Sequence, residues 1–170
     1  REFCETVTRL STTRPVNPQL VQDTPLDEGL FGLSEMLVDS FLPLIDAGVI
    51  KREVEGALIE AAFFVGPGAF YKRLREMPER ERQRIRMKPV SWVNSLYGNE
   101  DKKCKERVGA RFINNALMAT LLGAVVSDSL EDGRVIGGVG GQYDFAAQAF
   151  ALEDARFVVA LNATRLNGER

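Results

Sequence analysis

The feature that most limits the fold of this chain is the alternation of short apolar runs with segments of helical pattern. Ala57–Gly66 and Ala155–Thr164 are apolar runs of the length and composition of buried strands. Gly32–Ile50 carries apolar residues at three- and four-residue spacing, which predicts a helix that ends at Gly48. Apolar strands alternating with helices predict an α/β fold, an open and mainly parallel sheet flanked by helices.

Other segments between residues 69 and 98 are shorter. Residues 69–77 predict a short helix that ends before Pro78. The charge run 78–88 contains both signs and favours a solvated helical turn, with a basic phosphate clamp as the weaker alternative. Pro89 and Gly98 enclose a segment that reads as a strand or loop.

The C-terminal third is harder to interpret. Residues 110–130 fit either a helix or two buried strands, since Gly123 interrupts an otherwise apolar stretch. Asp132–Gly133 predicts a turn. A short strand over 134–138 and a helix over 143–152 are expected to follow. Residues 1–28, rich in Thr, Pro, Gln and Asn, predict an irregular arm, which leaves 29–170 as one domain.

Composition and charge exclude several classes of function. A net charge of −2 gives no basic field for nucleic acid. No run of about 18 apolar residues predicts a membrane span. Cys4 and Cys104 are far apart and lack metal-ligand spacing, so a reduced, cytoplasmic protein without a metal is expected.

The chain has no histidine, which limits its chemistry most. Ser–His–Asp and Cys–His catalysis are excluded within these residues, and so are histidine zinc sites. Carboxylates, Lys, Tyr, Ser, Cys and backbone N–H groups remain as candidates for catalysis.

The stretch "GGVGGQYD" (Gly137–Asp144) concentrates four of the fifteen glycines. Its spacing is neither the dinucleotide fingerprint nor a P-loop. If 134–138 is a strand, the loop lies at a carboxyl end, where α/β sheets bind ligands and bare N–H groups can face an oxyanion. Spacing alone slightly favours a plain structural turn over a ligand loop.

Four segments, taken together and in order, resemble the acetyl-CoA hydrolase/CoA-transferase family, of the type with a glutamate nucleophile. These are "GLSEMLVDSFLPLIDAGVI", "AAFFVGPGAFYKRL", "MKPVSWVNSLYG" and the stretch from "RFINNAL" through "GGVGGQYDF". The resemblance covers roughly Gly29–Thr164 and corresponds to the C-terminal half of the family. It implies a CoA-transferase-like half domain, with the N-terminal half and the extreme C-terminal part absent.

The resemblance also implies a mechanism. Glu35 corresponds to the family's nucleophile on an acyl-CoA thioester, and Asn94 to an asparagine that helps to position the acyl group. Gly138, Gly140, Gly141 and Gln142 correspond to the loop that lies against CoA. Coenzyme A, carried by an acyl-CoA substrate, and small carboxylic acids are the implied ligands. The implied protein partners are the N-terminal half and further copies in a homo-oligomer.

Each assignment has a structural alternative. Glu35 could be an exposed residue at a helix start, and Asn94 could cap a turn. Asp144 is better explained as a charge at a helix N-terminus, while Gln142 and Tyr143 could line the site or only pack. Two alternatives therefore remain. The chain is part of an enzyme that transfers CoA or hydrolyses acetyl-CoA through a glutamyl-CoA intermediate, or it is a non-catalytic CoA-binding or structural half domain.

Overall fold

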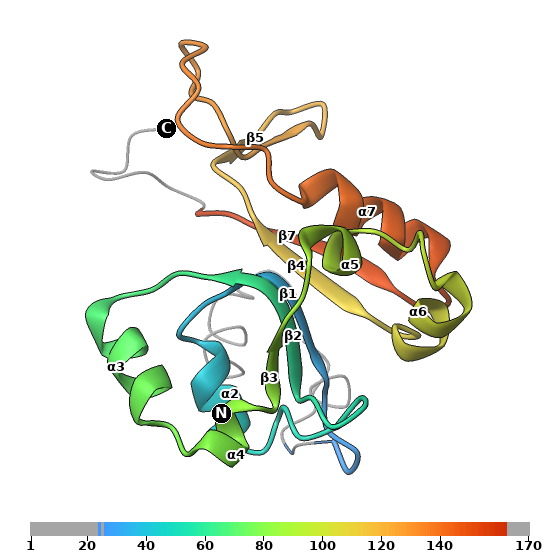
Figure 1. The fold of residues 1–170 in the computed structure, drawn as a ribbon. Helices are drawn as coiled ribbons and strands as arrows, with labels where there is room; N and C mark the ends of the chain where they lie inside the picture. The colour runs from blue at the N-terminus through green and yellow to red at the C-terminus, as the bar shows by residue number, and fades with distance from the viewer. Residues whose placement is uncertain (1–23, 25, 163–170) are drawn as a thin grey trace. The chain divides into compact units, whose positions relative to one another are not determined.

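The computed structural model describes Thr24 and residues 26–162 of the 170-residue chain. The predicted arm over 1–28 therefore lies almost entirely outside the described residues. The chain divides into two compact units, Arg1–Arg86 and Met87–Arg170 (Figure 1). No helix among the described residues is long and apolar enough to cross a membrane.

The first unit is built on a three-stranded sheet. Its strands are β1 (Gly32–Leu37), β2 (Ile59–Phe64) and β3 (Ile85–Met87), in the order β1-β2-β3. β1 and β2 run parallel, with Gly32 opposite Ile59 and Leu37 opposite Phe64. The helices of this unit are α2 (Phe41–Asp46), α3 (Gly68–Glu76) and α4 (Glu79–Arg82). The predicted strand at Ala57–Gly66 and the helix at 69–77 are thus confirmed. The exposed helical turn predicted for the charge run 78–88 forms only over Glu79–Arg82, because Ile85–Met87 pairs into the sheet as β3.

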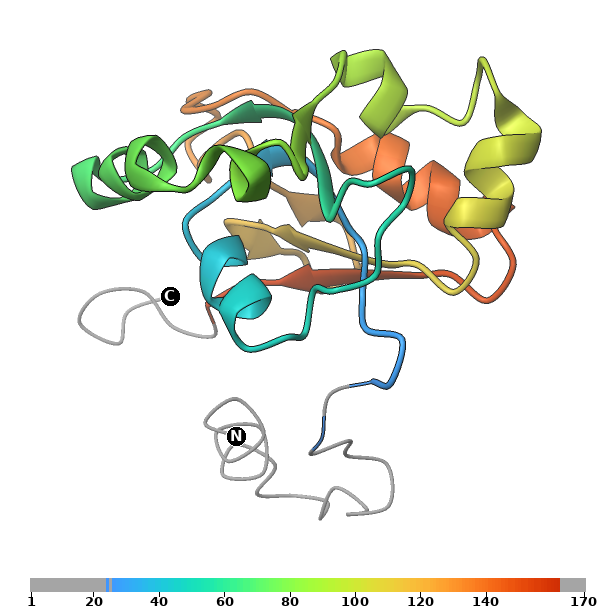
Figure 2. The ribbon, with the colours of Figure 1, turned by 60° about the horizontal axis from the view of Figure 1, so that its bottom comes forward.

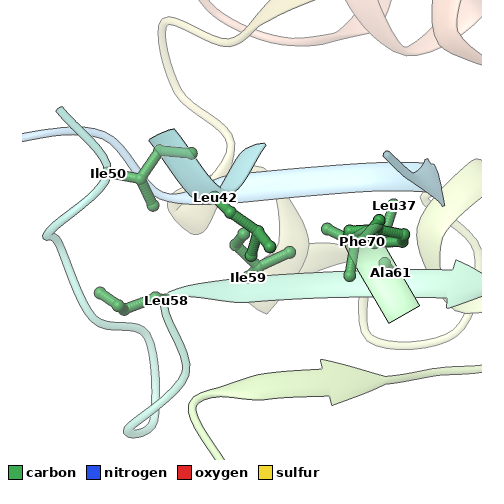
Figure 3. Packing of buried hydrophobic residues seen from close by; sticks show 7 residues of the cluster. All are labelled: Leu37, Leu42, Ile50, Leu58, Ile59, Ala61 and Phe70. Atoms are coloured by element: carbon green, nitrogen blue, oxygen red, sulfur yellow. The ribbon is translucent and has the colours of Figure 1, made fainter. Parts of the chain in front are cut away.

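The core of the first unit joins the parallel strands to the helices (Figure 3). Leu42 of α2 and Phe70 of α3 belong to one buried cluster with Ile59 and Ala61 of β2. The other buried members of the cluster are Leu37, Ile50 and Leu58. Because β2 buries its first residues almost completely, its apolar sequence, interrupted only by Glu60, is explained by its place between β1 and β3.

The single helix predicted through Leu33–Ile45 and ending at Gly48 is wrong. Gly32–Leu37 is a strand because it pairs with β2, and only Phe41–Asp46 is helical. Pairing with a neighbouring strand outweighs an apolar spacing that suited both structures. The predicted end is correct: Gly48 has φ +67° and its N–H donates to Ile45 O at 2.9 Å.

The second unit pairs β4 (Arg111–Asn115) with β7 (Arg156–Ala160) in parallel. α7 (Gln142–Ala151) lies along this pair (Figures 1 and 2), and the rings of Phe112 and Phe145 are 5.3 Å apart. The unit also contains α5 (Val90–Asn94), α6 (Glu100–Glu106) and an antiparallel hairpin of β5 (Met118–Ala119) and β6 (Val125–Val126). The helix expected over 143–152 is confirmed, and β7 forms within Ala155–Thr164, half exposed rather than buried.

Three predictions for the second unit are wrong. Residues 90–94 form a helix rather than a strand or loop. The Pro89 carbonyl begins it by accepting hydrogen bonds from the N–H groups of Trp92 and Val93. Residues 110–130 form one strand and an exposed hairpin, with Leu121 and Leu122 in solvent. No strand forms over 134–138, where the chain makes only the isolated Ser129–Val135 bridge.

The α/β class with mainly parallel, open sheets flanked by helices is confirmed, although the parallel strands lie in two separate sheets.

Candidate functional site

Glu35 lies in β1, two residues before the strand ends at Leu37. The alternative that placed it at a helix start is therefore wrong. β1 is parallel to β2, and ligands of open α/β sheets bind beyond the carboxyl ends of parallel strands. The Glu35 side chain is half-buried. Glu35 therefore stands near the carboxyl end of a parallel pair of strands.

Exposed apolar side chains surround this end of the sheet. Met36 pairs in register with Phe63, and both are exposed, as are the following Phe64 and Val65. Ser34 Oγ donates to Met36 O at 2.7 Å in an exposed hydrogen bond along the same strand. Apolar surface with a few polar groups is the usual lining of sites for small molecules.

A second carboxylate in this sheet was missed by the sequence reasoning. Glu60 of β2 is opposite Leu33 in the register and is only 4% exposed. Buried acids are rare unless another group compensates their charge. The only signal in the sequence is a single acid inside the apolar run Ala57–Gly66.

Asn94 is the last residue of α5 and is buried. Its backbone oxygen accepts a hydrogen bond of 2.8 Å from Gln148 Nε2 of α7. Ser95, which follows, has extended backbone angles, so the chain leaves the helix directly after Asn94. Asn94 thus stands at the junction of α5 and the segment that leads to α6.

Two cations from α6 and its C-terminal end also bind this junction. Arg107 is buried and donates to Trp92 O at 2.8 Å and to Gln148 Oε1 at 2.5 Å. Lys103 is 1% exposed and donates to Ser95 O at 2.7 Å and Tyr97 O at 2.9 Å. Its ammonium also lies 4.8 Å from the centroid of the Trp92 ring.

The burial of Lys103 changes its acidity. Loss of hydration lowers the pKa of Lys103 below its ordinary value of 10.5, and the neighbouring charge of Arg107 lowers it further. Glu100 opposes this shift by raising the pKa. The sequence gives no signal of this burial, because apolar spacing does not reveal a buried cation bound to carbonyl oxygens.

The glycine loop leads into α7. Gly138 and Gly140 are exposed, Gly140 has φ +60°, and Gly141 is buried as the residue that precedes the helix. The expectation that the loop follows a strand is wrong, because residues 134–138 are not a strand. The loop instead stands at the N-terminus of a ten-residue helix, where backbone N–H groups and the helix dipole favour negative charge.

The first residues of α7 differ in their surroundings. Gln142 Oε1 is buried and has no hydrogen-bond partner among the described residues. Tyr143 is exposed, so it lies at the surface rather than packing in the core. Asp144 lies in the first turn, as expected of a charge that interacts with the helix dipole.

The structure joins Asn94 to the helix that begins at the glycine loop, because Gln148 belongs to α7. Both parts of the candidate site lie in the second unit, and Glu35 lies in the first. In the described part of the chain, no group of three or more Cys, Asp or Glu side chains could hold a metal ion. Cys104 is a half-buried free thiol, while Cys4 lies outside the described residues.

A match to a family model identifies the family of this chain. A family model described as the acetyl-CoA hydrolase/transferase C-terminal domain matches residues 66–170, which include Asn94 and the glycine loop. Among solved structures, RipA from Yersinia pestis is similar, with a TM-score of 0.62 and 26% identity over 84% of this chain. A mutant RipA structure gives a TM-score of 0.65 and also 26% identity over 84% of this chain. The chain spans only 31% of the length of each of these RipA chains. A search of curated proteins found no match.

Proposed function

Because the chain belongs to the acetyl-CoA hydrolase/transferase C-terminal domain family, we propose that it is part of an enzyme acting on acyl-CoA. The enzyme transfers CoA between carboxylic acids or hydrolyses acetyl-CoA. The class of reaction is inferred from family membership. Glu35 precedes the matched residues, and its role is supported by its position near the carboxyl end of β1 in a parallel pair.

In this proposal the Glu35 carboxylate is the nucleophile. One of its oxygens attacks the thioester carbonyl, the C–S bond breaks, and CoA leaves as the thiolate with the acyl group on Glu35 as an anhydride. The thiolate then attacks the side-chain carbonyl of Glu35 and releases the free acid. The resulting glutamyl-CoA thioester passes CoA to another carboxylate, or water hydrolyses it. A thiolate is a good leaving group, so this sequence needs no histidine.

Asn94 and the glycine loop serve the acyl-CoA in this proposal. The Asn94 side chain orients the acyl group, and Gly138, Gly140 and Gly141 let the backbone approach the thioester oxygen closely. A backbone N–H directed at the developing oxyanion contributes about 2.7–4 kcal/mol to lowering a barrier of this type. Gln142, whose Oε1 lacks a partner among the described residues, is the loop residue that we assign to CoA contact.

Replacement of the nucleophile is the test of this function. In the full natural chain, Glu35→Gln preserves size and removes the nucleophilic oxygen, so turnover of acetyl-CoA should fall at least about 10³-fold. Glu81→Gln makes the same chemical change on the exposed α4 and should leave turnover unchanged. Circular dichroism establishes that both variants are folded. Full turnover by Glu35→Gln would exclude Glu35 as the nucleophile and leave the non-catalytic half domain as the better account.

A second assay separates transfer from hydrolysis. The release of free CoA from acetyl-CoA is followed with and without an added carboxylic acid. Release that depends on the acid identifies a transferase, and release without it identifies a hydrolase.

We also propose that turnover requires an N-terminal half, because the RipA chains are about three times as long as this chain. We further propose that the protein is a homo-oligomer located in the cytoplasm. Light scattering on the full natural chain measures its oligomeric state.

A further inference from the structure

The carbonyl groups at the end of α5 are bound by side chains from other elements of the second unit. Gln148 Nε2 of α7 donates to Asn94 O at 2.8 Å and to Val93 O at 3.3 Å. Arg107 Nη2 donates to Trp92 O at 2.8 Å, and Nη1 donates to Val93 O at 3.3 Å. A five-residue helix leaves its last carbonyls without intrahelical donors, and these contacts satisfy them.

The contacts fix each side chain in one orientation. Arg107 offers only donors, so Gln148 must turn its oxygen toward Arg107 and its amide nitrogen toward the carbonyls. Gln148 is 2% exposed and Arg107 6%. An amide and a guanidinium at such burial are costly unless their hydrogen bonds are made, so the arrangement tolerates few alternatives.

The same contacts tie two parts of the candidate site together. Gln148 lies in α7, the helix that begins directly after Gly141, and its amide holds the backbone of Asn94. α7 is held in turn by the packing of Phe145 on Phe112 of β4. The position of Asn94 relative to the glycine loop therefore depends on Gln148 and on the guanidinium that orients it.

We propose that Arg107 and Gln148 are positioning residues, which act on the reaction by fixing Asn94 relative to the glycine loop. The inference rests on the function proposed above for Asn94 and the loop. Neither side chain is assigned a contact with acyl-CoA. Misplacement of a reacting group by about 1 Å costs on the order of 100-fold in rate, so the loss should appear in kcat.

The test uses two conservative variants in the full natural chain. Arg107→Lys keeps the charge but has a single ammonium in place of the two donor nitrogens. Gln148→Glu keeps a side-chain oxygen that accepts from Arg107 but removes the amide nitrogen that donates to Val93 O and Asn94 O. Each should lower kcat by about 10- to 100-fold, with KM for acetyl-CoA within about threefold of the wild type. The double variant should be no slower than the slower single variant, because both act through one arrangement.

Arg111→Lys is the matched control. Arg111 also donates to backbone carbonyls, those of Gly109 and Asp154, but it is exposed. Its kcat should stay within about twofold of the wild type. The proposal is overturned if Arg107→Lys and Gln148→Glu keep wild-type kcat, if they change only KM, or if Arg111→Lys is equally slow.

Hydrogen exchange separates this inference from the proposed function. In Gln148→Glu, amides over residues 92–98 should exchange faster, while those of β4 and β7 stay protected. Unchanged exchange over 92–98 overturns the positioning role whatever the activity. Faster exchange, together with a wild-type chain that neither transfers nor releases CoA, supports the structural linkage and rejects the proposed function.

Discussion

At the scale of single residues, the buried cation Lys103 is the clearest departure from what its sequence context suggests. It lies in the seven-residue α6, which contains six charged residues and one cysteine, yet its side chain is fully buried in the second unit. Two carbonyl oxygens and the face of Trp92 replace the water that Lys103 loses. These contacts hold the chain between α5 and α6 at Ser95 and Tyr97.

The lowered pKa of Lys103 predicts a pH dependence of stability. Between its folded pKa and 10.5, the unfolded chain binds more protons at this lysine than the folded chain does. The Lys103 contribution to the free energy of unfolding should therefore increase as pH rises through that window. In denaturant unfolding, Lys103→Met should lack this part of the increase of the free energy of unfolding with pH. Lys105→Met, an exposed position in the same helix, should keep it. An identical slope in the wild type and Lys103→Met would contradict the burial of a charged lysine.

Gly32 provides a second test at this scale. A Cβ at Gly32 would stand 2.7 Å from Ile59 Cγ1 across the β1–β2 pair, whereas a Cβ at Gly68 would meet nothing within 4 Å. Gly32→Ala should lower the free energy of unfolding by about 1–3 kcal/mol through overpacking. Gly68→Ala, at the start of α3, should leave it unchanged or raise it by up to about 1 kcal/mol. Equal effects of the two substitutions in denaturant unfolding would argue against this close approach of the strands.

At the scale of elements, α7 connects the glycine loop to the core of the second unit. Its inner face places Phe145 against Phe112 and Gln148 against the end of α5. Its outer face leaves Phe150 in solvent. The helix is thus held by apolar packing on β4 and by the hydrogen bonds of Gln148 to α5.

Two phenylalanines of α7 distinguish these faces. Phe145 is 7% exposed and Phe150 is 92% exposed. Phe145→Ala should lower the free energy of unfolding by about 3–5 kcal/mol because it leaves a cavity beside Phe112. Phe150→Ala should change it by less than about 0.5 kcal/mol. A comparable loss in both variants, measured by urea titration, would contradict the packing of α7.

The sequence predicts an element well when residues within that element determine its structure, and poorly when contacts with distant residues determine it. β2, α3 and α7 follow from apolar runs and patterns within their own residues. β1 does not, because the apolar residues of Gly32–Ile50 fit a helix as well, and pairing with β2 decides between the two structures. α5 was missed because Pro89 can begin a helix as readily as a loop. Residues 134–138 have strand composition but no neighbouring strand long enough to pair with.

The candidate site was predictable to a similar degree. Glu35, Asn94 and the glycine loop were named from motifs that occur in order along the chain. Their supports were not, since Arg107 and Gln148 are 41 residues apart and meet only in the folded unit. Long-range contacts between polar side chains leave no periodic signal in one sequence. The motifs therefore indicate which residues to test, and the fold shows that Arg107 and Gln148 hold the backbone at Asn94.

At the scale of the whole molecule, the family match spans residues 66–170 and so includes parts of both units. The proposed nucleophile precedes this range, in the first unit, while Asn94 and the glycine loop follow in the second. The proposed function assigns the nucleophile to the first unit and the positioning groups to the second. Its central claim is that CoA becomes covalently bound to Glu35.

Chemical trapping tests that claim most directly. The full natural chain is incubated with acetyl-CoA, treated with borohydride, digested, and its peptides are weighed by mass spectrometry. A glutamyl-CoA thioester is reduced to an alcohol, so the peptide that contains Glu35 should lose one oxygen and gain two hydrogens, only when acetyl-CoA is present. An unmodified Glu35 peptide, or reduction at another carboxylate such as Glu60, would contradict the account.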